Sequence, residues 1–333
     1  MIFASTTKLS YFFNKLAYFD NLLSLFTQNY IIFVSNIFNM IQELVSHCST
    51  CYDLEVGKAP FTNDHCVSCE NCLREIHFPR DTHRQYDCVV MCHYYVCHNI
   101  YRYATEMLWL FHDKALGLKT RTCPIRMCSI GCGPCSELVA FEEYYKNKNL
   151  PFEFTYDGFD TNKIWNPVQE YVKSISARPE NITFHNEDVF DYYAQCDTKP
   201  NVIILNYMLS DMLNHDKAGF HTFLKKLNEF VKQLPSCAIL VNDINLGQYD
   251  SQPRYYYQNL INMISDNLQP DRLVVSKAHF KDSLKPYYRY GNNPRARNSI
   301  LFRVPDEISS KFVTNTECHS AQLLIIKKKQ EAI

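Results

Sequence analysis

From about residue 125 onward, short apolar runs of strand length alternate with longer segments in which apolar residues recur at helical spacing. The stretch 217–234 shows the helical pattern most clearly, with apolar side chains at Phe220, Phe223, Leu224, Leu227, Phe230, Val231 and Leu234. Helical spacing also occurs at 164–175 and 256–268, and strand-like runs occur at 152–159, 181–186, 201–205, 237–241, 273–276 and 322–326. Strands that alternate with helices pair in parallel through crossover connections, so the pattern predicts a doubly wound α/β sheet.

A glycine loop opens this alternating region. The sequence 127–139, MCSIGCGPCSELV, reads as a β-prone run, then Gly131 and Gly133, then a helix-like stretch. Glycine has no Cβ, so a ligand can approach bare backbone at the carboxyl end of the strand. Two glycines in one loop are common, and the motif gains weight from the polar residues downstream.

Three polar residues follow successive predicted strands: Asp160, Asp188 and Asn206. In an open α/β sheet the ligand crevice lies beyond the carboxyl ends of the strands. Asp160 stands at the distance from the glycine loop at which an acidic residue usually binds ribose hydroxyls, and a carboxylate can accept two hydrogen bonds from a diol.

Residues from about 125 to 327 resemble a class I S-adenosylmethionine-dependent methyltransferase domain. IGCGP resembles the family's first motif, FDTN with Asp160 its ribose-binding motif, NEDVF with Asp188 its adenine motif, and LNYMLSD with Asn206 its fourth motif. The resemblance implies a Rossmann-like sheet of seven strands with the last one antiparallel. It implies S-adenosylmethionine as cofactor, bound by Gly131, Gly133, Asp160, Asp188 and Asn206. The fourth motif differs from the form used by amino-group DNA methyltransferases, which argues against N6-adenine chemistry.

The sequence leaves two alternatives to a methyltransferase. A nicotinamide dehydrogenase would carry G-x-G-x-x-G, but position 136 is Ser, and no Tyr-x-x-x-Lys stretch stands out downstream. A methyltransferase-like domain that only binds the cofactor is the other alternative, and the intact acidic positions argue against it.

Cysteine is the second strong feature, with 15 in the chain and 8 of them between positions 48 and 97. The amino end lacks the basic region and cleavage site of a secretory signal peptide, so we expect a cytoplasmic protein and metal binding rather than disulfides. Two C-x-x-C pairs can complete a tetrahedron around zinc. The candidate ligands are Cys48, Cys51, Cys66, Cys69, Cys72 and Cys88, with the choice of second pair left open.

Other readings of the cysteines remain. Cys66-x-x-Cys69-x-x-Cys72 also suits an iron–sulfur cluster, although the separate pair at Cys48 and Cys51 favours zinc. Cys132 and Cys135 form another C-x-x-C inside the cofactor loop, where a metal would collide with the cofactor. We therefore interpret these two as incidental thiols.

The predicted organisation has four parts: a helical segment at 1–46, a zinc-binding region at 47–84, a connecting helix at 85–122 and the methyltransferase domain at 123–333. The first part carries an apolar stripe, but polar residues interrupt it before it reaches the roughly 18 apolar residues of a membrane span. We expect no transmembrane segment.

The net charge of −1 excludes a polycation, so nucleic-acid binding requires a local patch. The segment 281–303 is one candidate, because it combines basic residues with interleaved tyrosines, a pattern that suits single-stranded RNA. Its candidate substrate contacts are Arg289, Arg295 and Arg297. The sequence thus predicts a methyltransferase that acts on RNA held by the zinc region and this loop. Protein or small-molecule methylation with purely structural zinc is the alternative.

Overall fold

The computed structural model describes residues from one of two units of the chain. The chain divides into the units Met1–Asn39 and Met40–Ile333, and the structure describes residues of the second alone. The described residues are 40–56, 68–77, 85–118, 123–150, 152–244, 248–249, 252–253, 260, 272–280, 293–295 and 301–328. The helix expected at 256–268 lies outside them except for Leu260, as does most of 281–303.

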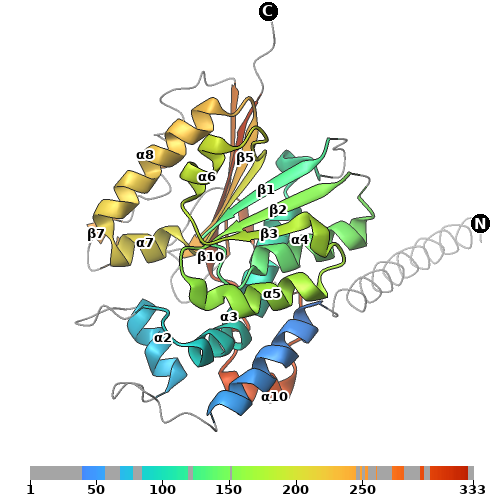
Figure 1. Cartoon of the computed structure of the whole chain (residues 1–333), viewed down its shortest axis with the longest axis vertical. Helices are drawn as coiled ribbons and strands as arrows, with labels where there is room; N and C mark the ends of the chain where they lie inside the picture. Colours follow the sequence, from blue (N-terminus) through green and yellow to red (C-terminus); the bar gives the residue numbers. More distant parts are fainter. Residues whose placement is uncertain are drawn as a thin grey trace, which may run out of the picture. The chain divides into compact units, whose positions relative to one another are not determined.

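A mixed sheet of eight strands organises this unit, in the order β3-β2-β1-β4-β5-β10-β8-β9 (Figure 1). Its strands are β1 (Ile125–Ile130), β2 (Phe154–Phe159), β3 (Ile182–His185), β4 (Val202–Asn206), β5 (Cys237–Ile244), β8 (Leu273–Phe280), β9 (Asn293–Arg295) and β10 (Ser320–Lys327). Strands β1 to β5 pair in parallel, whereas β10 is antiparallel to both β5 and β8. The predicted Rossmann-like sheet with an antiparallel last strand is confirmed, and β9 adds an eighth strand to the expected seven.

Helices cover both faces of the sheet. They are α3 (Val89–Phe111), α4 (Ser136–Lys148), α5 (Asn166–Ile175), α6 (Val189–Gln195), α7 (Leu209–His215) and α8 (Lys217–Gln233). On one face, α6 and α8 pack on alternate side chains of the central strands, including Ile203, Leu205 and Ile239. On the other, α3 packs on α4. Central strands buried on both faces read as continuous apolar runs, which is why 201–205 and 237–241 were visible in the sequence.

Short elements complete the described part. They are α2 (Cys69–His77), α10 (Asp306–Phe312), β6 (Gln248–Tyr249), β7 (Gln252–Pro253), and the 3-10 turns η1 (Lys114–Leu116), η3 (Lys163–Trp165) and η4 (Pro179–Asn181). Residues 40–56 form a further helix. Within the described residues, no helix is long and apolar enough to cross a membrane.

Helix α3 is buried over most of its length, unlike a connecting segment. Buried residues such as Tyr103, Glu106 and Met107 lie along it, and it contacts β5 and β10 as well as α4. A 23-residue helix that is apolar nearly all round is typical of a core element. α3 therefore belongs to the same packed body as the sheet and supplies one wall of the site described next.

Candidate functional site

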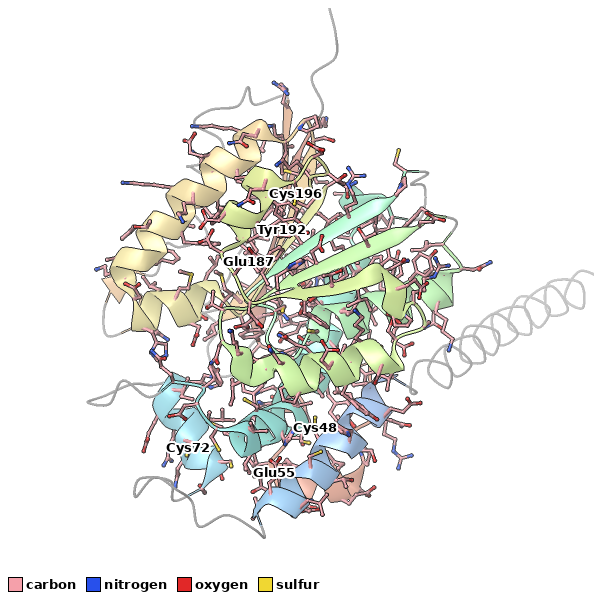
Figure 2. The ribbon with its side chains drawn as sticks, viewed as in Figure 1. Cys48, Glu55, Cys72, Glu187, Tyr192 and Cys196 are labelled. Atoms are coloured by element: carbon pink, nitrogen blue, oxygen red, sulfur yellow. The ribbon has the colours of Figure 1, made fainter. Side chains whose placement is uncertain are left out.

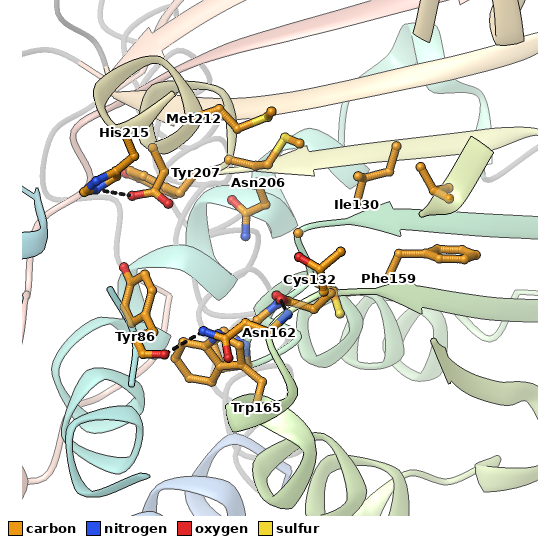
Figure 3. Close-up of a pocket in the computed structure, with 18 of the residues that line it drawn as sticks. Tyr86, Ile130, Cys132, Phe159, Asn162, Trp165, Asn206, Tyr207, Met212 and His215 are labelled. Atoms are coloured by element: carbon orange, nitrogen blue, oxygen red, sulfur yellow. Dashed lines mark hydrogen bonds and ion pairs between the residues drawn. The ribbon is translucent and has the colours of Figure 1, made fainter. Parts of the chain in front are cut away.

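A cavity of 440 Å³ lies at the carboxyl ends of the parallel strands (Figure 3). All five predicted cofactor residues line it: Gly131 and Gly133 after β1, Asp160 after β2, Asp188 after β3 and Asn206 at the end of β4. Parallel strands end at one edge of a sheet, so residues far apart in sequence meet there. The volume falls within the range of small-molecule sites.

The glycine loop takes its shape from backbone that only small residues adopt easily. Gly131 has φ +65° and Gly133 has φ +46°. The amides of Gly131 and Cys132 both donate to the carbonyl oxygen of Phe159, at 2.8 and 3.1 Å, which ties the loop to β2. A Cβ on Gly131 would lie 2.8 Å from Cγ of Met208, so the loop also packs closely on the segment after β4.

Asp160 joins the loops that follow β1 and β2. Its Oδ2 accepts from the amide of Gly133 at 2.9 Å, and its Oδ1 accepts from the amide of Asn162 at 2.9 Å. Burial raises the pKa of this carboxyl to about 6, although the two amides work against that shift. Each carboxylate oxygen can accept a second hydrogen bond, so both stay available to a ligand in the cavity.

Asp188 has a structural role besides its place in the lining. Its Oδ1 accepts from the amides of Phe190 and Asp191, which caps helix α6. Its Oδ2 lies 3.2 Å from the ammonium of Lys226. The capping side chain of an aspartate stabilises a helix by satisfying its free amides. The resemblance implies that Asp188 lies beside the adenine of the cofactor. The same side chain would then both cap α6 and take that role.

Asn206 links the loop to the centre of the sheet. Its Nδ2 donates to Oγ of Ser136 at 2.8 Å, and its Oδ1 accepts from Nδ2 of Asn242 at 2.9 Å. Its neighbour Tyr207 has φ +55°, which is rare for a bulky residue. The amide of Tyr207 donates to the carbonyl of Asn242 at 2.7 Å, and its hydroxyl donates to Glu106 at 2.8 Å, so contacts on both sides hold the strained conformation.

Glu106 is the centre of a polar network that the sequence analysis missed. This fully buried carboxylate on α3 accepts from the Tyr207 hydroxyl and from Nδ2 of Asn242 through Oε2, and from the amides of His319 and Ser320 through Oε1. The network holds the Tyr207 side chain in place through its hydroxyl group. An acid inside an otherwise apolar helical segment was the signal that could have identified it.

Aromatic side chains on and before α3 form another part of the lining that sequence reasoning missed. Tyr86, Tyr95 and Tyr103 line the cavity together with Trp165 and Tyr207. On the same side, Asp211 and His215 of α7 face each other, with 3.6 Å between Oδ1 and Nε2. The density of tyrosine between positions 86 and 103 was visible in the sequence, but it read as the buried stripe of a helix.

The predicted zinc cysteines do not form a metal site within the described part of the chain. Cys48 and Cys51 lie on the helix 40–56, Cys69 and Cys72 on α2, and Cys88 immediately before α3. Figure 2 shows Cys48 and Cys72 on their separate helices. No group of three or more His, Cys, Asp or Glu side chains converges among these residues. C-x-x-C places two thiols three residues apart, and helices carry that spacing as readily as metal-binding turns. Cys66 lies outside the described residues.

The cysteines of the glycine loop are buried free thiols. Burial raises the pKa of both Cys132 and Cys135, so they are poor nucleophiles at neutral pH.

Of the three arginines predicted to bind substrate, Arg295 alone is described. It lies in β9, with its guanidinium 5.4 Å from the ring centre of Trp109 and 6.0 Å from that of Phe280. Burial lowers its pKa to about 10. Arg289 and Arg297 lie outside the described residues.

Comparison with known proteins finds solved structures that align with this chain at low sequence identity. No protein-family model and no curated protein matches this chain. The plantazolicin methyltransferase BpumL in complex with SAH is 12% identical, over 87% of this chain and 100% of that chain, with a TM-score of 0.42. An O-methyltransferase family protein from Burkholderia thailandensis is 10% identical, over 70% and 58% of the two chains, with a TM-score of 0.42. Precorrin-6y C5,15-methyltransferase from Geobacter metallireducens is 9% identical, over 65% and 87%, with a TM-score of 0.36. Such low values carry no argument about activity, which has to come from the site itself.

Proposed function

We propose that this chain is an S-adenosylmethionine-dependent methyltransferase. The observation that carries the proposal is the convergence of Gly131, Gly133, Asp160, Asp188 and Asn206 on one cavity at the carboxyl edge of the sheet. The sheet order, with an antiparallel β10 between β5 and β8, agrees with the fold that the sequence motifs imply.

The lining residues fit the cofactor by their chemistry. Gly131 and Gly133 leave backbone uncovered, and the helix α4 that follows presents its amino end, which favours an anionic group such as the cofactor's carboxylate. Asp160 supplies acceptor oxygens for a ribose diol. The bound cofactor would supply a methyl group already activated by the sulfonium.

The residues of the chain then have three tasks: holding the cofactor, aligning the acceptor and excluding water. The rings of Tyr86, Tyr95, Tyr103 and Trp165 and the loop 131–134 line the cavity. Alignment of the reactants and exclusion of water can supply much of the barrier reduction. Burial raises the pKa of Tyr86 and Tyr207 well above the ordinary phenol value, so neither serves as a general base near neutral pH.

The proposal is tested by calorimetric titration with S-adenosylmethionine and S-adenosylhomocysteine, beside Asp160→Ala. Micromolar binding by the unmodified protein, lost in a folded Asp160→Ala variant, supports it. A folded protein that binds neither compound overturns it. Binding without turnover on any acceptor would support the alternative of a non-catalytic binding module.

RNA as acceptor remains a prediction from the sequence. The segment 281–303 that motivates it lies largely outside the described residues, and zinc has no converging ligand set among those described. RNA binding that weakens steeply with salt would support that acceptor, because phosphate contacts release counterions.

A further inference from the structure

Aromatic rings form one wall of the cavity. The ring centres of Tyr86 and Trp165 are 5.4 Å apart, those of Tyr95 and Trp165 are 5.4 Å apart, and those of Tyr86 and Tyr95 are 5.6 Å apart with the rings at 90°. Three rings in mutual contact, two of them perpendicular, form adjoining walls of a box. Ring faces attract cations through their quadrupole, and such boxes recognise ammonium groups.

The hydroxyl of Tyr86 is already engaged outside this box. It forms a hydrogen bond of 3.1 Å with Nε2 of His77, whose pKa burial lowers to about 4, so the imidazole is neutral. Tyr86 therefore offers the cavity its ring rather than a free donor. Arg102 stacks over Tyr103 and Tyr207, at 4.8 and 5.6 Å from the ring centres, but it does not line the cavity.

The charge of the cavity has one sign. Its described lining contains five carboxylates and neither lysine nor arginine; the acids are Asp160, Glu187, Asp188, Asp211 and Asp216. Asp160 and Asp188 lie on the side of the glycine loop, whereas Asp211 lies on α7, beyond β4. The Asp211 side chain keeps 40% of its surface accessible although it lines an internal cavity. It can therefore reach a ligand directly.

His215 next to Asp211 has a defined hydrogen-bonding state. Its Nε2 lies 2.9 Å from the carbonyl oxygen of Ile76, which can only accept, so Nε2 carries a hydrogen. In the neutral imidazole this leaves Nδ1 as a proton acceptor. Asp211 and His215 thus form a pair able to hold a cation and to remove a proton from it.

We propose that the methyl acceptor is an amine that enters as an ammonium cation, with Asp211 as its counter-ion and the rings of Tyr86, Tyr95 and Trp165 as its box. This inference rests on the proposed methyltransferase function. The ammonium first loses a proton to the Asp211–His215 pair, which passes it to solvent. The free nitrogen pair then forms the new N–C bond, while the electron pair of the broken C–S bond stays on the cofactor sulfur, and the product leaves as a methylated ammonium.

A polyanionic acceptor fits this cavity poorly. Phosphates placed among the described lining would meet five carboxylates and neither lysine nor arginine, and like charges brought together in an interface are strongly unfavourable. An uncharged hydroxyl compound could donate a hydrogen bond to Asp211 but would form no ion pair with it. The amine alone uses both the carboxylate and the ring box.

The test uses protein saturated with S-adenosylhomocysteine, so that the cofactor already occupies the groups it needs. Benzylamine, charged at neutral pH, and benzyl alcohol, its uncharged counterpart, are titrated in parallel by calorimetry. We expect benzylamine to bind at least about tenfold tighter. Asp211→Asn should abolish the preference, whereas Asp191→Asn, an exposed acid on α6 outside the lining, should leave it unchanged.

Equal affinity for the two compounds, including no detectable binding of either, overturns the inference. So does a preference that survives in a folded Asp211→Asn variant. Failure of the protein to bind S-adenosylhomocysteine is a separate result, because it contradicts the proposed function itself. Transfer of a methyl group to benzylamine, detected by mass spectrometry and weakened in Asp211→Asn, would support the inference further.

Discussion

Replacing the two loop glycines by alanine should have unequal effects, although both have positive φ. In Gly133→Ala the new Cβ would lie 3.8 Å from Cε2 of Trp165, an ordinary contact, so the left-handed backbone alone costs about 1–2 kcal/mol. In Gly131→Ala the Cβ would lie 2.8 Å from Cγ and 3.3 Å from Cβ of Met208. That overlap forces Met208 or the loop to move, which adds about 1–3 kcal/mol.

The unfolded chain loses similar freedom in both variants, so the difference between them isolates the overlap. We expect Gly131→Ala to lower the free energy of unfolding by about 1–3 kcal/mol more than Gly133→Ala does. Urea denaturation followed by circular dichroism measures this. Measured against Met208→Ala alone, adding Gly131→Ala should cost less than it does in the unmodified protein, because alanine at position 208 removes Cγ, the nearer of the two close atoms.

Two results would refute this reasoning. Equal destabilisation by the two alanines would mean that Met208 yields without cost. A double variant whose losses simply add would mean that the loop and the segment after β4 are not in contact as described. Binding of S-adenosylhomocysteine should follow the same order, because Met208 and both glycines line the cavity.

Three further predictions concern acids of the sheet and its helices. Asp160→Asn should weaken S-adenosylhomocysteine binding about 10- to 100-fold in calorimetry, because one of its two backbone donors loses its acceptor. Asp157→Asn in β2, the strand that ends just before Asp160, should not weaken it, because Asp157 accepts from His185 and Tyr193 outside the lining. Equal losses in the two variants would contradict the assignment. Burial raises the pKa of Asp243 to about 6, so its contribution to stability is present below about pH 4 and is lost as the pH rises through 6. Over this range the free energy of unfolding of Asp243→Asn should fall by about 3 kcal/mol less than that of the unmodified protein. Parallel pH profiles of the two proteins would refute the prediction. Glu106→Gln should lower the free energy of unfolding, measured in urea, by about 2–4 kcal/mol, because the new amide NH₂ would face two hydrogen-bond donors. A loss no larger than that caused by Tyr207→Phe would contradict the network.

The sheet was predictable because its signals are local. The run before Gly131, the apolar runs at 201–205 and 237–241 and the polar residue after each strand all lie within a few positions of one another. Strand ends were less accurate: β5 continues to Ile244 and β8 to Phe280, since polar residues such as Asn242 and Asp243 are buried by partners distant in sequence. Periodicity cannot register such partners.

The acceptor side of the site was not predictable for the same reason. Tyr86 and Tyr95 line the cavity only after α3 folds against the sheet, and each of them alone reads as an ordinary helix or loop residue. Asp211 differs, because it follows the fourth predicted strand with Asn206 and Tyr207, and the sequence predicts that it lies near the point of methyl transfer. The cysteine pairs show the opposite failure. Their spacing is local and suggested metal knuckles, but the described pairs lie on helices, whose i, i+3 spacing the C-x-x-C pattern also fits.

The position of β10 has a consequence for the growing chain. Residues 320–327 form the strand that joins β5 to the β8–β9 pair. The sheet therefore stays in two separate parts while synthesis has reached only residue 319. Until then β5 and β8 each present an open row of backbone donors and acceptors, the feature that makes edge strands prone to pair with other chains. The nascent protein is therefore most prone to wrong strand pairing just before β10 takes its place between β5 and β8. A chaperone that shields these two edges during that interval would raise the yield of folded protein.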